Sequence, residues 1–461
     1  MERERRKKNS LRRFLAVLIL LVLVFCGLAM FRVGGEPSVS MTPEMPGIGR
    51  ATPVTVRLAE PRRGLYRARV ELVQEDRTFP VTEKTWRPQP AWKPWGAKTA
   101  EDLLAFEVGG DTVEELKSGR ASLRVIAERA DSWLRRPQPV VAEMTLPVRL
   151  SPPTIGVISS QHNVQQGGSG VVVYRLGEGA TESGVAAGER WFPGFPLPGG
   201  GGDYFALYGL PYDLDDSMAV TLVVQDDVGN RAERRFLDTF APKPVAQGTI
   251  RLSDDFMTRV VPEILAKTPS VRAGETVLDS YLAINGELRK ENRRWLVELA
   301  AESAKEFLWS EPFLPMKNAQ VMSPFAVRRT YTYNGEPVDT QYHLGFDLAS
   351  VRRAPIEAAN AGVVVAARFV GIYGNVVVVD HGYGLMTLYA HLSSTEVEEG
   401  ERVERGQVLG RSGETGLAGG DHLHFGILIQ GMPVTPVEWW DRQWIRDRFA
   451  AKLGEAFSYQ D

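Results

Sequence analysis

A long uncharged segment near the N-terminus places the strongest constraint on how this chain can fold. Phe14 to Phe31 is a run of 18 residues without a charged side chain, about the shortest helix that can span a bilayer. The mostly basic segment MERERRKKNSLRR precedes it, and Arg32 alone follows closely. Because basic residues favour the cytoplasmic side, residues 1–33 are predicted to form a cytoplasmic tail and a single-pass anchor. The bulk of the chain would then lie outside the cytoplasmic membrane.

Two other interpretations of this segment fit the residues less well. A cleaved signal peptide has an apolar stretch of about 7–15 residues and an A-x-A cleavage site, whereas this run is longer and has no such site. A lipoprotein attachment site at Cys26 would have a small residue before the cysteine, but Phe25 stands there. The segment is therefore interpreted as a transmembrane anchor.

Cysteine content and net charge exclude several classes of protein. The 461 residues contain one cysteine, Cys26, so the chain has no intrachain disulfide and no thiolate metal cluster. A metal site must therefore use His, Asp or Glu side chains. The formal net charge of -3 gives no indication of a nucleic-acid partner.

The sequence after the anchor changes in composition along its length. Residues 34–50 are rich in Gly, Pro and Ser and are typical of a linker. Residues 51–150 and 151–241 carry short alternating polar and apolar stretches between Pro- and Gly-rich loops, which predicts two β-rich, sandwich-like domains. Neither contains a charged cluster suited to catalysis, so spacer or recognition roles are expected for both.

Helical periodicity marks the connecting region over residues 242–317. Residues 253–267 and 276–309 have apolar side chains at near-helical spacing and are expected to pack on a neighbouring domain. Residues 318–461 return to β-sequence, with stretches such as AGVVVAARFV and NVVVVDHG, and end in a polar helix over 441–453. The expected fold class is a multidomain, mainly β chain.

Five of the six histidines lie in this last domain. In GLAGGDHLHFGI, His422 and His424 are separated by one residue, so on a strand both imidazoles point to the same face. In YHLGFDLAS, strand geometry likewise puts His343 and Asp347 on one face, with Gly345 between them. The missing side chain of Gly345 is expected to leave room for an ion and a substrate backbone.

A catalytic zinc site is built from three protein ligands and a water. His343, Asp347 and one of His422 and His424 supply suitable nitrogen and oxygen donors. The other histidine of the pair, with His391 in LYAHL, would serve proton transfer and charge stabilisation. The residues themselves leave open which of His422 and His424 binds the metal.

The C-terminal sequence resembles the lysostaphin/LytM-type zinc metallopeptidases, which cut the peptides of bacterial peptidoglycan. The resemblance covers roughly residues 320–437 and includes SPFAVR, HLGFD, YGNVVVVDHG, TLYAHL, GERVERGQVLG, SGETG and HLHFGI. It implies an antiparallel β domain with an open groove across one zinc ion. It also implies that His343, Asp347 and His424 are the metal ligands, and that His391 and His422 are the catalytic histidines.

Several other residues are interpreted from the same resemblance. His381 matches a family histidine that is not a ligand and is expected to be structural. Asp421 replaces a common proline and is expected to face solvent, and Ala326 replaces a common glycine, which affects the local turn rather than the metal. Arg328 matches a family arginine that either shapes the groove or forms an ordinary salt bridge. His162, outside the resemblance, is expected to be an ordinary surface or core residue.

This ligand set implies hydrolysis by metal-activated water. Zinc lowers the pKa of a bound water towards about 7, and the resulting nucleophile attacks a carbonyl that the metal polarises. His391 and His422 would orient the water, stabilise the oxyanion and return a proton to the leaving amine. The expected function is a membrane-anchored zinc endopeptidase that cuts peptidoglycan peptides on the periplasmic side of a bacterial cytoplasmic membrane. Which peptide bond is cut stays open.

Alternatives from other functional classes are compared with this interpretation. A catalytically silent protein of the same fold that regulates other cell-wall hydrolases would lack a ligand, and none is missing. A biotinyl or lipoyl carrier, which GERVERGQVLG also resembles, needs an attachment lysine, and none stands between Lys317 and Lys452. An adhesion or scaffold role for the upstream domains, with envelope or cell-division proteins as partners, is compatible with the enzyme. Autoinhibition by an upstream side chain in the fourth coordination position is a further hypothesis.

Overall fold

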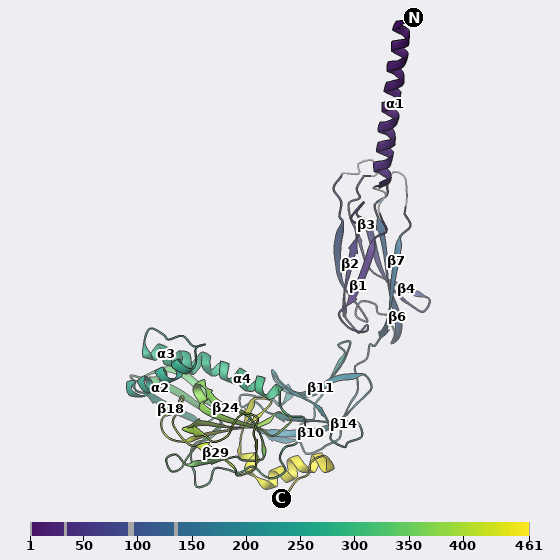
Figure 1. Ribbon diagram of the computed structural model, residues 1–461. Helices are drawn as coiled ribbons and strands as arrows, with labels where there is room; N and C mark the ends of the chain where they lie inside the picture. The colour runs from purple at the N-terminus through teal and green to yellow at the C-terminus, as the bar shows by residue number, and fades with distance from the viewer. Residues whose placement is uncertain (1, 32–34, 91–95, 133–136, 461) are drawn as a thin grey trace. The chain divides into compact units, whose positions relative to one another are not determined.

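The computed structural model describes residues 2–31, 35–90, 96–132 and 137–460 (Figure 1). Its strands form several, mostly antiparallel sheets, which confirms the expected mainly β, multidomain fold class. The chain folds into two compact units, one of Met1–Pro153 with Gln225–Arg231 and one of Thr154–Val224 with Ala232–Asp461. The finer division into a linker, two β-domains, a helical connection and a peptidase domain stays a prediction.

The N-terminal segment is the helix α1, Glu2–Phe31. Within it, Lys7–Gly27 is long and apolar enough to cross a membrane, and this window is not buried by the rest of the protein. A signal sequence has the same properties, so the helix is compatible both with an anchor and with a leader. Arg32, which follows the predicted span, lies outside the described residues.

Two antiparallel sheets in the first unit enclose one apolar core. Their orders are β1-β2-β5 and β4-β3-β6-β7. The strands are β1 (Ser38–Pro43), β2 (Thr52–Ala59), β3 (Leu65–Gln74), β4 (Arg77–Thr85), β5 (Glu101–Val108), β6 (Gly119–Arg129) and β7 (Val140–Val148). Val56, Val70 and Val125 on the inward-facing positions are fully buried, because side chains alternate between the faces of a strand. The unit is therefore a β-sandwich, and β1 lies within the segment interpreted as a linker.

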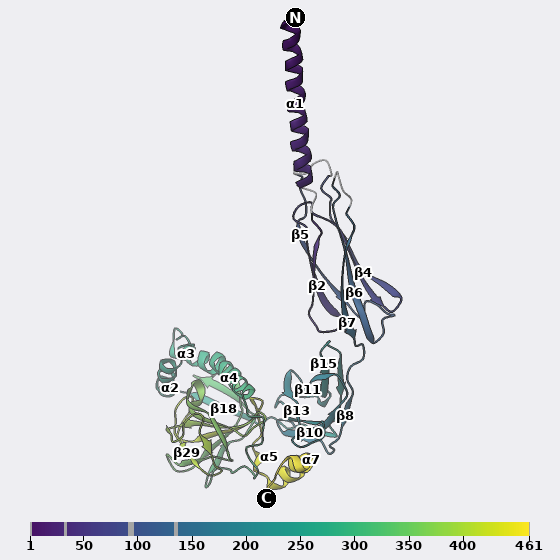
Figure 2. The same cartoon turned by 45° about the vertical axis from the view of Figure 1, so that its right-hand side comes forward.

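Two four-stranded sheets follow, with orders β13-β14-β10-β8 and β12-β11-β15-β16, and a parallel pair β17-β9 (Figure 2). The strands are β8 (Ile155–Val157), β9 (Asn163–Gln165), β10 (Ser169–Leu176), β11 (Ala180–Ala187), β12 (Arg190–Pro193), β13 (Phe195–Pro196), β14 (Asp203–Gly209), β15 (Val220–Asp226), β16 (Arg231–Arg234) and β17 (Thr239–Ala241). Except for the β15–β16 connection, these residues share one compact unit with the C-terminal region.

The predicted helical segment is confirmed between residues 254 and 301. It contains α2 (Asp254–Lys267), α3 (Val277–Ala283) and α4 (Arg289–Ala301), and a π-helical turn, Ile284–Leu288, joins the last two. The expected helix to residue 309 is wrong after Ala301. Ser303 Oγ and the Ala304 amide instead donate hydrogen bonds of 2.6 and 2.8 Å to the carboxylate of Asp380, which draws the backbone out of the helix.

The C-terminal region is built on a sheet of order β19-β22-β30-β26-β25-β24-β28, with β31 paired to β30. Its strands are β19 (Gln320–Ser323), β22 (Phe346–Ala349), β24 (Gly362–Val370), β25 (Gly374–Asp380), β26 (Leu385–Leu392), β28 (Arg402–Val403), β30 (Leu423–Ile429) and β31 (Met432–Val434). A smaller sheet joins β23 (Pro355–Glu357), β29 (Val408–Arg411) and β27 (Ser394–Thr395). After the short helix α5 (Val437–Trp440), the helix expected over 441–453 is present over residues 442–453, where α6 (Arg442–Trp444), a π-helical segment (Ile445–Ala450) and α7 (Ala451–Leu453) follow one another without a break.

The helical segment is integrated into this region rather than merely leading to it. The strand β18 (Gln247–Leu252) pairs in parallel with β20 (Val327–Tyr333), which in turn pairs with β21 (Glu336–His343). Both views show α2, α3 and α4 beside β18 (Figures 1 and 2). Met257 and Ile264 of α2 and Tyr281 of α3 share a buried cluster with Tyr331 and Ile372 of the sheet region. Any surface formed by that sheet edge therefore includes residues upstream of 318.

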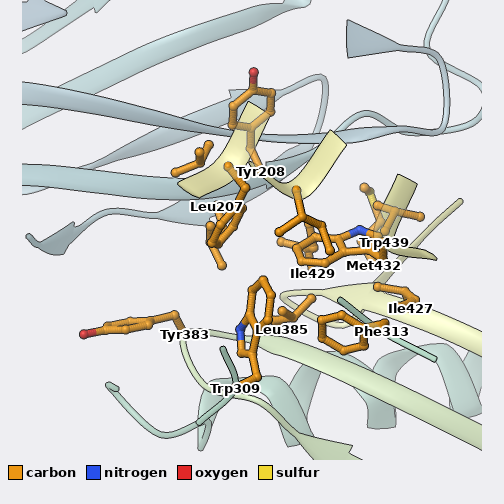
Figure 3. Packing of buried hydrophobic residues seen from close by; sticks show 14 of the residues in the cluster. Leu207, Tyr208, Trp309, Phe313, Tyr383, Leu385, Ile427, Ile429, Met432 and Trp439 are labelled. Atoms are coloured by element: carbon orange, nitrogen blue, oxygen red, sulfur yellow. The ribbon is translucent and has the colours of Figure 1, made fainter. Parts of the chain in front are cut away.

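A second buried cluster joins the β8–β17 strands to the C-terminal sheet. Leu207 and Tyr208 of β14 belong to the same core as Leu385 of β26 and Ile427 of β30, as the close-up shows (Figure 3). All four are at most 1% exposed, and burying a side chain of this size contributes about 1.5–3 kcal/mol. The two regions are therefore held together by a continuous apolar core.

A buried carboxyl group lies at this junction. Glu438 of α5 accepts hydrogen bonds of 2.8 and 2.9 Å from the amide and Oγ of Ser169, and one of 3.1 Å from Gln165 Nε2. Burial raises the pKa of the Glu438 carboxyl to about 7, although these hydrogen bonds act in the opposite direction. Neutral Glu438 thus suits this site better than the carboxylate does.

The raised pKa predicts a pH-dependent stability. Folding favours the protonated form, so this contribution is fully present below the ordinary value of 4.5 and is lost as the pH rises through about 7. Glu438→Gln should remove about 3 kcal/mol of this pH dependence from the free energy of unfolding. Thermal unfolding of both proteins at pH 5 and 8 measures it. Equal pH dependence in the two proteins would contradict the prediction.

Candidate metal centre

Three neighbouring elements bring the predicted ligands together. His343 ends β21, Asp347 lies in β22 and His424 lies in β30. The strands β22 and β30 are neighbours, and Asp347 is directly opposite His424 in their register. His343 reaches the same point from the adjacent three-stranded sheet. The centre therefore lies where two sheets meet.

The donor atoms of these residues are close enough to share one ion. His343 Nε2 lies 2.9 Å from Asp347 Oδ1 and 3.0 Å from His424 Nδ1, and the last two atoms are also 3.0 Å apart. A tetrahedral zinc ion with bonds of 2.0–2.1 Å needs its ligand atoms about 3.3–3.4 Å apart. No fourth His, Cys, Asp or Glu joins this group within the part of the chain that the structure describes, so an upstream ligand is not seen there.

The protonation of His343 supports a cation at this point. Its Nδ1 lies 2.9 Å from the carbonyl oxygen of Pro324, and because a carbonyl only accepts, Nδ1 carries the hydrogen. In the neutral ring, Nε2 then directs a lone pair at the Asp347 carboxylate, which is also an acceptor. Two acceptors facing each other repel, whereas a metal ion between them binds both. The donor set therefore fits a metal such as zinc.

Arg329 fixes the orientation of the carboxylate ligand. Its Nη2 donates to Asp347 Oδ2 at 2.7 Å and to Ser323 Oγ at 2.8 Å, which leaves Oδ1 directed at the two histidines. Burial disfavours the charged carboxylate, but the surrounding histidines, when protonated, donate hydrogen bonds to it and hold the pKa of Asp347 well below its usual range. Arg328, the residue singled out from the sequence, is exposed on the other face of β20.

Gly345 has a different role from the one expected. The strand geometry that placed Gly345 between two ligands does not hold, because β21 ends at His343 and β22 begins at Phe346. A Cβ at Gly345 would lie 2.5 Å from His424 Nε2 and 2.7 Å from the Phe425 carbonyl oxygen. The glycine therefore makes room for the ring of a ligand.

The two remaining histidines stand beside the donor group. His391 Nδ1 donates to the Thr415 carbonyl at 2.8 Å and His422 Nδ1 to the Gly420 carbonyl at 2.7 Å, so each ring keeps an unprotonated Nε2 when neutral. Their ring centroids are 4.9 Å apart. His391 also has a left-handed backbone (φ 64°), a strained conformation that is often found at functional sites.

Their environments move the two imidazole pKa values apart. Burial, with the nearby charges of His422 and His424, lowers the pKa of His391 well below its usual range. Burial also acts against a charged His422, but the hydrogen bond and the charge of Asp347 outweigh it and raise the pKa of His422. A neutral histidine beside one that holds its proton more readily is suited to divided acid and base roles.

Other predicted residues lie outside the centre. His381 is fully buried and bonded through both ring nitrogens, to the Ala361 carbonyl and to Thr387 Oγ1, as expected of a structural residue. Asp421 does not simply face solvent, because it accepts hydrogen bonds from Ser412 Oγ at 2.5 Å and from the Arg353 amide at 3.0 Å. These bonds fix the chain just before His422.

The substitution at Ala326 is accommodated without loss of the turn. Ala326 keeps a left-handed backbone (φ 65°), which favours glycine, and its amide donates to the His343 carbonyl at 2.7 Å. The cost of that conformation for alanine is about 1–2 kcal/mol. His162 is a buried core residue, bonded to Ser159 at 2.9 Å.

The donor group lies in a cavity of about 400 Å³. Its lining includes His343, Asp347, His391, His422 and His424. It also includes residues from the segment before the resemblance, namely Ile250, Arg251, Phe256, Tyr281 and Arg289. The cavity is of a size that suits a small ligand or a few residues of a peptide.

Comparison with known proteins identifies this region. A sequence profile described as peptidase family M23 matches residues 341–436. The C-terminal part of this chain is a peptidase family M23 domain. The matched residues contain the whole donor group, His343, Asp347 and His424, together with the two neighbouring histidines.

Relatives of the M23 domain are peptidases according to their names, and one of them is named for peptidoglycan. Over 125 residues it is 38% identical to the DD-carboxypeptidase/endopeptidase Mpg of Neisseria meningitidis serogroup B, covering 27% of each chain. Over 96 residues it is 42% identical to the peptidoglycan DD-endopeptidase ShyA of Vibrio cholerae, covering 21% of this chain and 22% of that one. The catalytic domain of lysostaphin from Staphylococcus simulans aligns with a TM-score of 0.21 and 24% identity, over 32% of this chain and 96% of that one. This chain spans about a quarter of the length of the curated relatives it matches.

The close approach at Gly345 yields a prediction about the M23 domain. Gly345→Ala should displace the ring of His424 and lower zinc affinity by about 10–100-fold, a loss in the range seen when the surroundings of a metal ligand are disturbed. Competition with a chromogenic chelator measures the affinity. Gly426→Ala, on the same strand as His424, is the matched control because its added Cβ meets Leu388 at an ordinary 3.6 Å. Equal affinities in both variants would show that this contact does not hold the ligand.

Proposed function

We propose that this chain is a zinc-dependent endopeptidase that hydrolyses peptide bonds of bacterial peptidoglycan. The observation that carries the proposal is the convergence of two imidazole nitrogens and a carboxylate oxygen within 3.0 Å of one another inside the M23 domain. We assign His343, Asp347 and His424 as the zinc ligands and His391 and His422 as the catalytic histidines. When bound, zinc would polarise the scissile carbonyl and acidify a water.

The side chains around the ligands support this assignment. Arg329 keeps one carboxylate oxygen of Asp347 away from the metal position, so the other is free to bind. The hydrogen bond to Thr415 holds His391 in the tautomer whose Nε2 accepts a proton from the attacking water. His422, which holds its proton more readily, would donate to the oxyanion and then to the leaving amine.

The proposed substrate bond follows from the names of the relatives. ShyA is named as a peptidoglycan DD-endopeptidase and Mpg as a DD-carboxypeptidase/endopeptidase, so we propose that this chain cuts the bond between D-alanine and a diamino acid in the crosslink. Such a reaction takes place outside the cytoplasm. We therefore propose that α1 anchors the chain in the cytoplasmic membrane with its N-terminus inside, in agreement with the basic residues before its apolar span.

A digestion of purified peptidoglycan tests the hydrolase. A soluble form that begins at Glu36 should release uncrosslinked muropeptides, identified by mass, and a chelator should abolish the release until zinc is restored. His343→Ala should lower the rate at least 10³-fold because it removes a ligand of the proposed metal. Zinc bound in stoichiometric amount, with no cleavage by the wild-type protein, would instead favour a binding or regulatory role.

Membrane anchoring has its own test. The full chain should stay in the membrane fraction after an alkaline carbonate wash, whereas the form that begins at Glu36 should be soluble. Mass analysis of the mature N-terminus distinguishes the two explanations of α1. A chain shortened by removal of the apolar span would show that α1 is a cleaved leader and would overturn the anchor.

A further inference from the structure

Three arginines line the cavity at the metal centre, and only one of them is paired with an acid. Arg329 forms an ion pair with Asp347 at 2.7 Å. Arg251 and Arg289 have no acidic side chain within 4.0 Å in the part of the chain that the structure describes. Arg289 therefore lines the cavity without a counter-ion. A ligand that carries negative charge would provide one.

Arg289 is held in place by neutral groups. Its Nε donates to the Asn285 carbonyl at 3.1 Å and its Nη2 to Asn285 Oδ1 at 2.7 Å. Asn285 is fully buried and donates in turn to Asp339 Oδ2 at 2.7 Å. Asn285 lies in the π-helical turn between α3 and α4, and such turns are frequent at functional sites. The guanidinium is thus fixed in direction, while its charge is not neutralised by an ion pair.

Arg251 belongs to a different element and has its side chain on the other face of the sheet. It lies on β18 opposite Thr332 of β20, whereas its neighbour Ile250 is opposite the cavity residue Tyr331. Because side chains alternate along a strand, the exposed Arg251 side chain lies on the same face as Arg328 and not with Ile250. Arg289 lies upstream of residue 318, outside the residues 341–436 that match the family, so it is a feature of this chain's own cavity lining.

The chemistry of the proposed substrate supplies a suitable anion. When D-alanine is joined to the side-chain amine of a 2,6-diamino dioic acid, the carbon that bears the scissile nitrogen also bears a free carboxylate. A terminal D-alanyl-D-alanine has the same arrangement. A planar guanidinium binds such a carboxylate through two parallel hydrogen bonds, which recognise both its charge and its direction.

We propose that Arg289 forms a carboxylate-binding subsite on the leaving-group side of the scissile bond. This subsite would select amides whose nitrogen is attached to a carbon with a free carboxylate, and it would disfavour the same peptides when that carboxylate is amidated. The inference rests on the proposed hydrolase function and adds its specificity determinant.

Defined peptides test the subsite. Five zinc-containing proteins are compared, namely the wild type, Arg289→Gln, Arg289→Lys, Arg251→Gln and Lys290→Gln, on a crosslinked dimer and on a D-alanyl-D-alanine peptide. Each substrate is supplied as the free acid and as the amide. Lys290 is the matched control because it neighbours Arg289 on α4 but is exposed and paired with Glu287 at 2.8 Å. The two substrates distinguish a crosslink carboxylate from a chain-terminal one.

A specific pattern of rates is expected. The wild type and Lys290→Gln should cleave the acid with a kcat/KM about 10–100-fold higher than that for the amide. Arg289→Gln should lose most of this ratio by slowing cleavage of the acid alone, whereas Arg251→Gln should keep it because the Arg251 side chain lies on the other face of the sheet. Arg289→Lys keeps a charge and should retain some preference, which separates lost recognition from lost folding. A ratio unchanged in Arg289→Gln would overturn the subsite.

Binding measurements separate failure of the subsite from failure of the hydrolase. Calorimetry with the acid and amide forms of the D-alanyl-D-alanine peptide reports recognition without turnover. Acid-selective binding that Arg289→Gln abolishes, with no cleavage of any substrate, would support the subsite and overturn the hydrolase. Cleavage of acid and amide at equal rates would support the hydrolase and overturn the subsite. The absence of both binding and cleavage would overturn both proposals.

Discussion

The arrangement of this domain depends on one buried carboxylate. The side chain of Asp347 is only 13% exposed, and its two oxygens are divided between different partners: Arg329 takes Oδ2, while Oδ1 faces His343 and His424. A buried charge is stable only when it is paired and hydrogen-bonded. The donor group of His343, Asp347 and His424 therefore forms only if the strands β20, β21, β22 and β30 keep their register. The strand pairing and the geometry of the metal centre depend on each other.

The shared cores explain how a small site becomes rigid. Strand β30 carries His424 and also Ile427, which packs against residues of the β8–β17 region. The helices α2 and α3 cover the opposite wall through Met257 and Tyr281. Motion of one wall relative to the metal would have to break one of these apolar clusters, which are packed to the density of a protein interior. Preorganisation of this kind lets a metal site and a peptide groove keep a common geometry.

Sequence patterns predicted the fold class and grouped the four histidines and one aspartate of the candidate site, because strand alternation and motif spacing are local properties. The choice of Arg328 over Arg329 failed for a non-local reason. The Asn334-Gly335 turn would set a regular ladder in which Arg328 shares a face with His343, but a bulge between Tyr331 and Thr332 shifts the register by one residue and reverses the faces. The position of Arg289 could likewise not be predicted from the sequence. It lines the cavity because of how α4, a helix distant in sequence from the ligands, packs in the fold.

The parallel pairing of β18 with β20 has a consequence for where this enzyme unit begins. A fragment cut at residue 318 would contain every residue of the family match, yet it would expose the hydrogen-bonding edge of β20 and the apolar surface that α2 covers. Open strand edges next to bare apolar surface are templates for aggregation. The boundary of sequence similarity and the boundary of the autonomous folding unit are thus different, and exchange of the segment from β18 to α4 between relatives would carry a groove wall with it.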